Sequence, residues 1–281
     1  MKKLSVFYNS NQSVKSNKSF SPSAGKPELV ANLFKKNKKV EINSNWEPLS
    51  IDQMSVAHAR FFVDGVMSCE RTNGFGNKLP EVAASLPWTN GSFYNAARYA
   101  YLNKTVTMSP TSGFHHAEWS RGDGFCTFNG LMISALLLQE EFNLSKIGII
   151  DFDAHYGNGT DDIISVLGVD YIEHYTFGGM SNKFNIDYDS WIDDLESNLK
   201  KQFHDCELLL YQAGADPHVE DPLGGFLTTE QMRMRDKIVF KVAKKLGIPI
   251  VWNLAGGYQD PIEKVLELHE NTLLECIDTY F

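Results

Sequence analysis

The sequence predicts an α/β protein with a single three-layer α/β/α arrangement around a mainly parallel sheet. Apolar segments of strand length at 146–153, 207–213 and 248–254 carry hydrophobic residues on both faces, which is typical of parallel strands covered on both sides. They alternate with longer segments of helical pattern, such as 191–203 and 228–246. This alternation indicates a sheet with helices on both of its faces.

The N-terminal region differs from the rest of the chain in composition. Residues 9–45 are rich in Ser, Asn and Lys and contain Pro22 and Pro27, so we expect a loop with one short helix. No internal repeat or low-complexity tract separates this region from the remainder of the chain. A length of 281 residues suits one α/β domain, so we expect residues 1–281 to form a single domain.

Helices and strands are expected to alternate from about residue 93. Segment 130–142 is strongly apolar, whereas 191–203 is amphipathic, and helix 228–246 has the clearest ends. Thr228 and Gln231 match a capping box, and Gly247 suits a helix C-terminus. In chain order the expected elements are a helix at 93–102, a strand at 105–108, a helix at 130–142, a strand at 146–153, a helix at 161–167, a strand at 170–175, a helix at 191–203, a strand at 207–213, a helix at 228–246, a strand at 248–254 and a helix at 262–280.

Charge and cysteine content limit the possible functions. A formal net charge of -9 disfavours a nucleic-acid or anionic-membrane surface, because both need a basic face. No stretch approaches the roughly 20 apolar residues of a membrane span, and the polar run 9–19 stands where a signal peptide would be apolar, so we expect a cytoplasmic protein. The cysteines are far apart and form no C-x-x-C pair, which disfavours disulfides and a thiolate zinc site; they are Cys69, Cys126, Cys206 and Cys276.

The segment 148–159 carries the strongest chemical signal. Asp151, Asp153 and His155 interrupt the end of a buried strand, where unpaired acids are rare. Asp153 and His155 are two residues apart, so on a strand their side chains would leave the same face. A carboxylate and an imidazole on one face suit a divalent metal, although a lone Asp-x-His would more often be a helix cap or a loop.

Three further clusters follow expected strands. Asp216 follows strand 207–213 and could be a third ligand, although Asp before Pro is also ordinary turn chemistry. The adjacent His115 and His116 could be a general base and its helper, or incidental loop residues. The two glycines before Tyr258 would let the chain bend, so that its hydroxyl could donate to an oxyanion; a plain turn is the alternative.

At these clusters the chain resembles the zinc-dependent histone deacetylase family, including its bacterial members. The motifs that carry the resemblance occur in the family's order, from about residue 110 to residue 258 and more loosely from His58. They are His115-His116 with Gly124-Phe125-Cys126, the segment 151–159, Gly214-Ala215-Asp216, and Gly256-Gly257-Tyr258. The resemblance implies the arginase/deacetylase-like fold and hydrolysis of N-acyl groups on lysine-type amines.

The resemblance also implies a role for each matching residue. It makes Asp153, His155 and Asp216 the ligands of one Zn²⁺ per chain. Asp151 would orient His115 and help hold a monovalent cation, usually potassium. The remaining implied site residues are the tandem histidines His115 and His116, Asn158 beside the second of them, the oxyanion donor Tyr258 with the turn residues Gly256 and Gly257, and the pocket residues Gly124, Phe125 and Leu223.

The chain departs from the family pattern at three places. Asn158 stands where one branch of the family has Asp, and an amide cannot raise the pKa of His116 as a carboxylate would, which favours His116 as the neutral base. Glu173 or His174 falls where many members have a Ser that completes the cation shell. Residues 19–23 lack the His-Pro pattern of many relatives.

Several alternatives stay open at this point. Relatives that deacetylate polyamines carry an acid where this chain has Leu223, so we expect acyl-lysines to be preferred unless Glu220 or Asp221 points inward. An arginase-type ureohydrolase would need a further acid at Gly157. A non-catalytic binding protein is the remaining alternative. The expected partners are an acylated lysine or a small N-acyl amine, without nucleic acid or membrane; a homo-oligomer is left open.

Overall fold

The computed structural model describes residues 2–180 and 186–281. Within these residues seven strands form one sheet in the order β2-β1-β3-β7-β6-β4-β5, and every neighbouring pair is parallel. The predicted mainly parallel sheet is therefore confirmed. The strands are β1 (Leu4–Phe7), β2 (Val40–Asn43), β3 (Val106–Ser112), β4 (Ile147–Asp151), β5 (Ile172–Thr176), β6 (Leu208–Gly214) and β7 (Ile250–Ala255).

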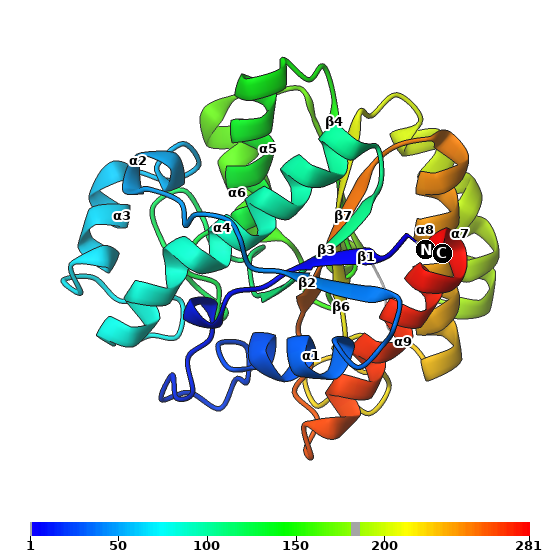
Figure 1. Ribbon diagram of the computed structural model, residues 1–281, viewed down its shortest axis with the longest axis horizontal. Coiled ribbons are helices and arrows are strands. Elements are labelled where there is room, and N and C mark those ends of the chain that lie inside the picture. The colour runs from blue at the N-terminus through cyan, green and yellow to red at the C-terminus, as the bar shows by residue number, and fades with distance from the viewer. Residues whose placement is uncertain (1, 181–185) are drawn as a thin grey trace.

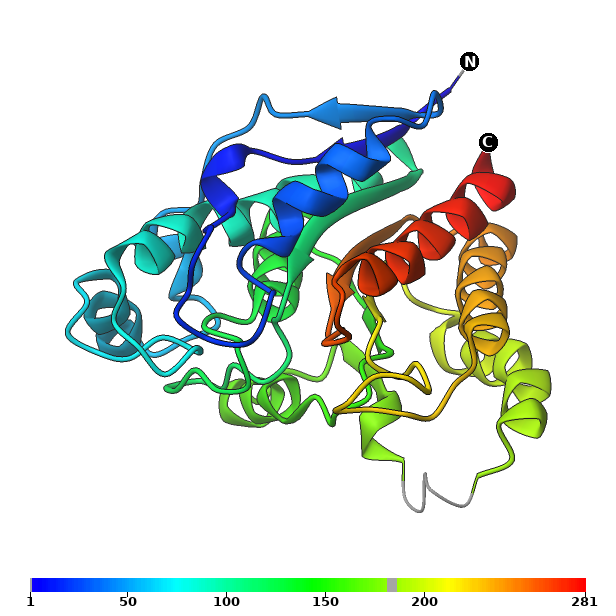
Figure 2. The same ribbon diagram turned by 90° about the horizontal axis from the view of Figure 1, so that it is seen from below.

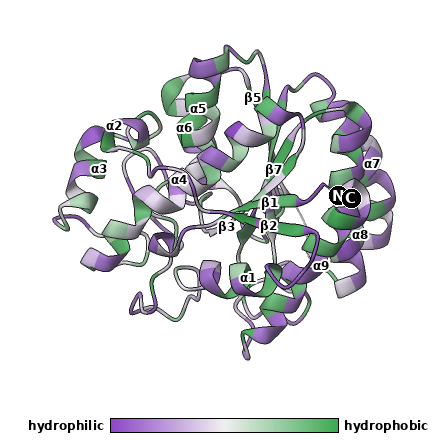
Figure 3. Cartoon of the chain, viewed as in Figure 1, coloured by the Kyte–Doolittle hydropathy of each residue, from purple (hydrophilic) through white to green (hydrophobic). Residues whose placement is uncertain are grey.

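Helices cover both faces of the sheet, which gives the three layers (Figure 1). One face packs against α1 (Lys26–Phe34), α7 (Tyr188–Phe203), α8 (Thr229–Leu246) and α9 (Glu263–Tyr280). The other packs against α4 (Pro80–Asn103), α5 (Gly130–Phe142) and α6 (Asn158–Leu167), with α2 (Ile51–Met54) and α3 (Arg60–Met67) farther out. In Figure 3 the central strands are largely hydrophobic, whereas the outer helix α7 carries many hydrophilic residues. Among the described residues no helix combines the length and hydrophobicity that crossing a membrane requires.

The N-terminal half contains more regular structure than its sequence pattern predicts. The short helix expected within 9–45 is α1, but β1, β2, α2 and α3 are additional. β1 and β2 have four residues each, too few to show a clear periodicity. Helix α4 begins at Pro80 rather than near residue 93, because Pro80 occupies the first turn, where its missing N–H costs nothing. Pro87 and Gly91 hide the helical pattern in between.

Two strand ends also differ from expectation, and both lie near the site. β3 continues past residue 108 to Ser112 through Pro110, with a register shift between Ser109 and Ser112. β4 ends at Asp151, so Asp153 and His155 belong to the loop that follows rather than to the strand. Strand alternation therefore does not determine how these two side chains point, contrary to the expectation from their spacing.

Parallel strands end at the same edge of a sheet, and the polar clusters follow strands that are neighbours there. β3, β7, β6 and β4 are adjacent in the sheet although β3 and β7 are far apart in the sequence. Seen from below, the loops after these strands gather on one side, and the N-terminal loop ahead of α1 reaches the same side (Figure 2). Ligand sites in open α/β sheets form at this edge.

Candidate active site

A carboxylate–imidazole cluster lies where β4 and β6 end. Asp153, His155 and Asp216 each offer one ligand atom, and these three atoms lie within 4.8 Å of one another. His155 Nδ1 is 2.9 Å from Asp153 Oδ1 and 2.9 Å from Asp216 Oδ2. Both acids are buried. The loop after β4 is held in place by the same carboxylates, because Asp216 accepts the Ala154 N–H and Asp153 accepts the His155 N–H.

The charges in this cluster fit a bound cation. Burial and the neighbouring Asp153 raise the pKa of Asp216 to about 7. The adjacent carboxylates of Asp153 and Asp216 raise the pKa of His155 to about 10. Asp216 Oδ2 is buried and has no hydrogen-bond partner among the described residues, since the single proton on His155 Nδ1 goes to Asp153. A divalent metal would satisfy this oxygen and both carboxylates at once.

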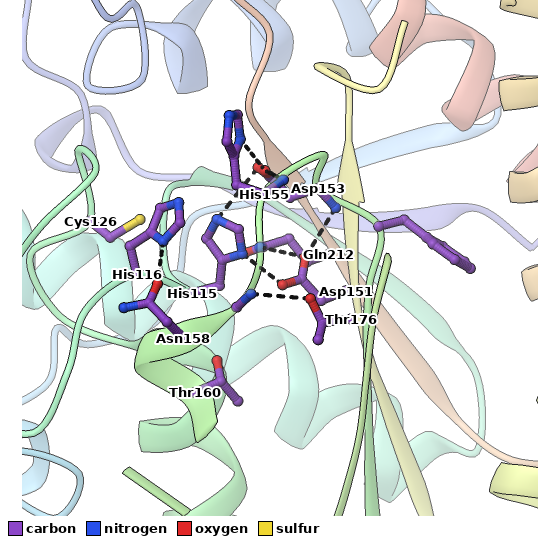
Figure 4. A network of polar contacts seen from close by, with 12 residues as sticks. His115, His116, Cys126, Asp151, Asp153, His155, Asn158, Thr160, Thr176 and Gln212 are labelled. Atoms are coloured by element: carbon purple, nitrogen blue, oxygen red, sulfur yellow. Dashed lines mark hydrogen bonds and ion pairs between the residues drawn. The ribbon is translucent and has the colours of Figure 1, made fainter. Parts of the chain in front are cut away.

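The two adjacent histidines are held by different partners. His115 Nδ1 donates to Asp151 Oδ2 at 2.7 Å, and His116 Nδ1 donates to Asn158 Oδ1 at 2.6 Å (Figure 4). Their ring centroids are 4.1 Å apart. Asn158 also donates from its Nδ2 to Glu118 Oε1, which fixes the orientation of the amide. The proton on His116 therefore lies on Nδ1, and its Nε2 is left as a base.

The surroundings of the two histidines shift their pKa values in opposite directions. Burial opposes the charged form of His115, but Asp151 and Asp153 outweigh it and raise its pKa to about 9. Burial and the neighbouring His115 lower the pKa of His116 below its usual value. His116 is thus the neutral imidazole of the pair and His115 the charged one. The hydrogen bond to Asn158 acts in the opposite direction, so burial and His115, rather than the amide, keep His116 neutral.

Asp151 has a second side-chain partner that sequence reasoning missed. Gln212 Nε2 donates to Asp151 Oδ1 at 3.0 Å, while the Asp153 N–H donates to the same oxygen. Gln212 lies in β6, where every residue is buried. A glutamine inside an otherwise apolar strand was the available signal, because buried polar groups require partners.

The turn after β7 packs directly against the candidate metal cluster formed by Asp153, His155 and Asp216. Gly256 has φ +49° and Gly257 has φ +90°, the left-handed region in which glycine is favoured. A Cβ at Gly256 would lie 2.2 Å from Asp216 Cγ, so only glycine fits. Burial, together with Asp153 and Asp216, raises the pKa of the Tyr258 hydroxyl, which keeps its proton available for donation.

Aromatic side chains form the wall beside Tyr258. The ring of Phe125 is 5.8 Å from that of Tyr258, and a Cβ at the preceding Gly124 would lie 2.4 Å from His116 Cδ2. Phe20 was not predicted; its ring lies 5.1 Å from Phe125 and 6.1 Å from Tyr258, although the residue is 73% exposed. The loop that carries Phe20 also lines an open cavity of about 710 Å³ together with Lys26 and Ile262, and Asp153, His155 and Asp216 are not part of its lining.

The loop after β6 presents Leu223, which is 44% exposed. The two acids that precede it differ in their placement. Glu220 pairs with Lys264 at 3.1 Å, and Asp221 accepts the backbone N–H groups of Leu223 and Tyr258. Glu220 is therefore engaged by Lys264, whereas Asp221 is buried and takes the inward placement that the sequence expectation left open.

Of Glu173 and His174, the two residues considered for the cation shell, only His174 lies beside Asp151. A Cβ placed at Gly157 would lie 2.8 Å from Asp151 Oδ2 and 3.1 Å from His174 Cε1, so His174 lies beside Asp151. Its Nδ1 donates to Asp161, and its buried Nε2 has no partner among the described residues. Glu173 instead contacts Lys146 and Gln202, away from the site.

Known proteins share this sequence pattern. A sequence model of the histone deacetylase domain matches residues 23–167 and 179–273. Histone deacetylase 2 of Arabidopsis thaliana is 31% identical over 173 residues, 55% of this chain and 44% of that protein. Histone deacetylase 10, chloroplastic, of Oryza sativa subsp. japonica is 27% identical over 259 residues, 76% of this chain and 58% of that protein. The chain thus spans about half the length of these curated relatives.

A solved structure shares the fold. The crystal structure of the HDA15 HD domain matches this chain with a TM-score of 0.75 and 16% identity, over 99% of this chain and 89% of that chain. This likeness confirms the arginase/deacetylase-like α/β fold that the sequence resemblance implied.

Proposed function

The chain belongs to the histone deacetylase family, and from this premise we propose that it is a zinc-dependent hydrolase that removes acetyl or related acyl groups from lysine-type amines. The observation that carries the proposal is the Asp153–His155–Asp216 cluster lying next to a histidine pair and the turn that bears Tyr258. We propose residues 1–281 as one catalytic domain.

Asp153, His155 and Asp216 would hold the zinc ion. When bound, zinc would supply a Lewis acid for the acyl carbonyl and would lower the pKa of water to near neutrality. Cobalt or ferrous iron could substitute, because a carboxylate–imidazole set is harder than a thiolate set. A single cluster of this kind occurs among the described residues, and Gly157 brings no further acid, which favours one metal over the two of an arginase-type site.

The histidine pair would transfer protons, and Tyr258 would stabilise the negative charge that develops on the substrate. His116 Nε2 would take the proton of the attacking water, since His116 is the neutral imidazole. His115, charged and oriented by Asp151, would protonate the leaving amine. Tyr258 would donate to the oxyanion of the tetrahedral intermediate. The aromatic wall of Phe125 and Phe20 would line the path of the alkyl chain.

We propose acyl-lysine in peptides as the preferred substrate, with acetylpolyamines as the alternative. Leu223 offers an apolar contact, and Glu220 is already paired with Lys264. Asp221 already accepts two backbone N–H groups, so both acids beside Leu223 are engaged, which would weaken their attraction for the distant ammonium of a polyamine. The four cysteines are unpaired, which is consistent with the reducing cytoplasm as the proposed location.

A monovalent cation beside Asp151 would meet the imidazole of His174 as well as the hydroxyl of Thr176, which accepts the Gly157 N–H. Potassium prefers oxygen ligands, and the imidazole supplies none. Both oxygens of Asp151 already accept hydrogen bonds. We therefore expect activity to depend little on potassium, which is tested by replacing potassium with sodium in the assay buffer.

The proposed function is tested by metal-dependent turnover. The purified protein is stripped with a chelator, reloaded with zinc and assayed on acetyl-lysine peptides, acetylspermidine and urea-releasing guanidino substrates. We expect amide hydrolysis only after reloading, about one metal per chain by elemental analysis, and loss of both in Asp216→Ala. Two metals per chain with ureohydrolase activity would establish the arginase alternative. Zinc binding without turnover of any N-acyl amine would favour a binding protein.

A further inference from the structure

The turn that carries Tyr258 lacks regular secondary structure of its own. Residues 256–259 follow β7 without helix or strand hydrogen bonds. Two charged side chains from distant parts of the chain contact its backbone instead. Lys26, at the start of α1, donates from Nζ to the carbonyl oxygen of Gly256. Asp221, in the loop after β6, accepts the N–H of Tyr258 at 2.7 Å.

Both side chains are buried, which makes their contacts costly to leave unsatisfied. Lys26 is 0% exposed and Asp221 is 5% exposed. Asp221 uses its other oxygen to accept the Leu223 N–H at 2.9 Å, so the carboxylate ties the turn to the loop after β6. A buried ammonium or carboxylate is tolerated only where it is paired or hydrogen-bonded. Here the two charges also lie close enough to attract each other.

We propose that Lys26 and Asp221 are positioning residues that hold the Gly256–Gly257 turn from both sides and thereby aim the hydroxyl of Tyr258 at the metal cluster. Close packing also restricts how far the backbone of this turn can move. A Cβ at Gly257 would lie 2.5 Å from Val265 Cγ1, and Gly256 packs against Asp216. A small displacement of the backbone would therefore move Tyr258 relative to the reacting carbonyl, and misplacement of about 1 Å can cost about 100-fold in rate.

A simpler role for Lys26 is to neutralise the buried acids Asp153, Asp216 and Asp221. The two roles differ in what they affect. Neutralisation acts on the metal ligands, so its loss would change metal binding whether or not Tyr258 is present. Positioning acts through Tyr258 alone, so its loss would have no consequence once the hydroxyl has been removed.

A double-mutant cycle with Tyr258→Phe distinguishes these roles, and it rests on the proposed hydrolase function. The variants are Lys26→Met, Asp221→Asn, Tyr258→Phe and the two double mutants, all loaded with zinc. Lys35→Met, exposed at the end of the same helix, and Glu220→Gln, exposed beside Asp221, are the matched controls. The measurements are kcat, KM, metal content and melting temperature.

We expect Lys26→Met and Asp221→Asn each to lower kcat by about tenfold or more, but by no more than the roughly 10²–10³ for losing one oxyanion donor outright. KM and metal content should change little, and in the Tyr258→Phe background either substitution should lower kcat less than about twofold. Lys26→Arg should restore part of the kcat that methionine loses. A crystal structure of Lys26→Met should show the turn displaced, which needs no activity.

The proposal would be overturned if the substitutions at Lys26 and Asp221 reduced kcat independently of Tyr258→Phe. If the losses multiply with that of Tyr258→Phe, or if metal content falls in parallel with kcat, Lys26 and Asp221 serve the metal cluster instead. If Lys26→Met does not fold, Lys26→Arg and Asp221→Asn decide the same question. An inactive wild-type enzyme would refute the proposed function; an active wild type with a defective Tyr258→Phe and an unaffected Lys26→Met and Asp221→Asn would refute only this inference.

Discussion

At the scale of single residues, the site depends on which atom each side chain can present. Asn158 offers His116 an oxygen only because its amide nitrogen is bound by Glu118. His155 Nδ1 lies between the carboxylates of Asp153 and Asp216 and carries a single proton, which it can donate to only one of them. Each of these choices follows from the donor and acceptor inventory of the side chain.

Replacing Tyr258 with Phe removes one hydroxyl and little packing volume. Because the hydrogen bond to an oxyanion strengthens as charge develops, kcat should fall by about 10²–10³ while KM changes little. The fold and the zinc content should be retained. Steady-state kinetics with elemental analysis checks this. An unchanged kcat would mean that the tyrosine only packs against Phe125.

Replacing Gly256 with Ala should abolish the metal site. The new Cβ would meet Asp216 Cγ at 2.2 Å, in a backbone conformation that L residues rarely adopt. We expect metal content well below one per chain and loss of activity. Gly247→Ala is the matched control: it has φ +72° but nothing within 4 Å, so it should cost only about 1 kcal/mol of stability. Equal metal content in both variants would contradict the prediction.

At the scale of elements, loops and helix termini place the site residues. His58 connects the loop that contains Glu118 with the N-terminus of α5. Its Nδ1 donates to the carbonyl of Glu118, and its Nε2 accepts the N–H of Asn129, the N-cap of α5. Both ring nitrogens are used in the neutral form. Burial lowers the pKa of His58 to about 4.

This histidine should make the fold sensitive to mild acid. The unfolded chain, with a His pKa near 6.5, binds a proton below that pH that the folded chain does not bind, so the unfolding free energy falls as pH decreases from 6.5 toward 4. Between pH 7.5 and 5.5 its contribution is a loss of about 1 kcal/mol. Urea unfolding in the presence of chelator should show this loss reduced in His58→Gln. The same pH dependence in both proteins would exclude His58 as its source.

The loop after β6 should set substrate class. Leu223→Glu places a carboxylate at an exposed rim position, where it would attract the distant ammonium of acetylspermidine. We expect the ratio of kcat/KM for acetylspermidine to that for an acetyl-lysine peptide to rise at low salt, by about tenfold, and Leu223→Gln to leave it unchanged. A wild type that already prefers acetylspermidine, or a ratio that does not move, would argue against a role of Leu223 in substrate choice.

At the scale of the whole molecule, the sheet and its loops hold acids that repel each other without a cation. Asp153 and Asp216 are buried, and they come from loops after neighbouring strands. A metal that binds only the folded state stabilises it in proportion to its affinity. The stability of the fold should therefore depend on metal content.

Removing the metal should lower the melting temperature. A ligand present at 100 times its dissociation constant adds about 2.7 kcal/mol, which corresponds to roughly 5–10 °C for a domain of this size. Calorimetry with and without chelator measures the shift. Asp216→Asn is the control and should not respond to chelator. A wild type with the same melting temperature in both conditions would speak against a bound metal.

The sequence by itself determined the fold class and named the residues that the structure brings together at the candidate site. Hydrophobic patterns along the chain reveal buried strands and helices, and parallel strands all end at one edge, so polar residues after them were expected to meet. Local patterns failed where elements were short or interrupted, as in β1, β2 and the first half of α4. Proline and glycine obscured the periodicity there without preventing the helix.

Only the tertiary structure decided which residues support the site from a distance. Gln212 reaches Asp151 across two neighbouring strands, and Lys26 reaches Gly256 although 230 positions separate them in the sequence. The tertiary structure also placed His174, rather than Glu173, beside Asp151. Such contacts have no signature in local spacing, because chain topology and the packing of distant elements determine which side chains meet. The sequence thus specified the chemical groups, and the packing of the sheet with its loops chose their partners.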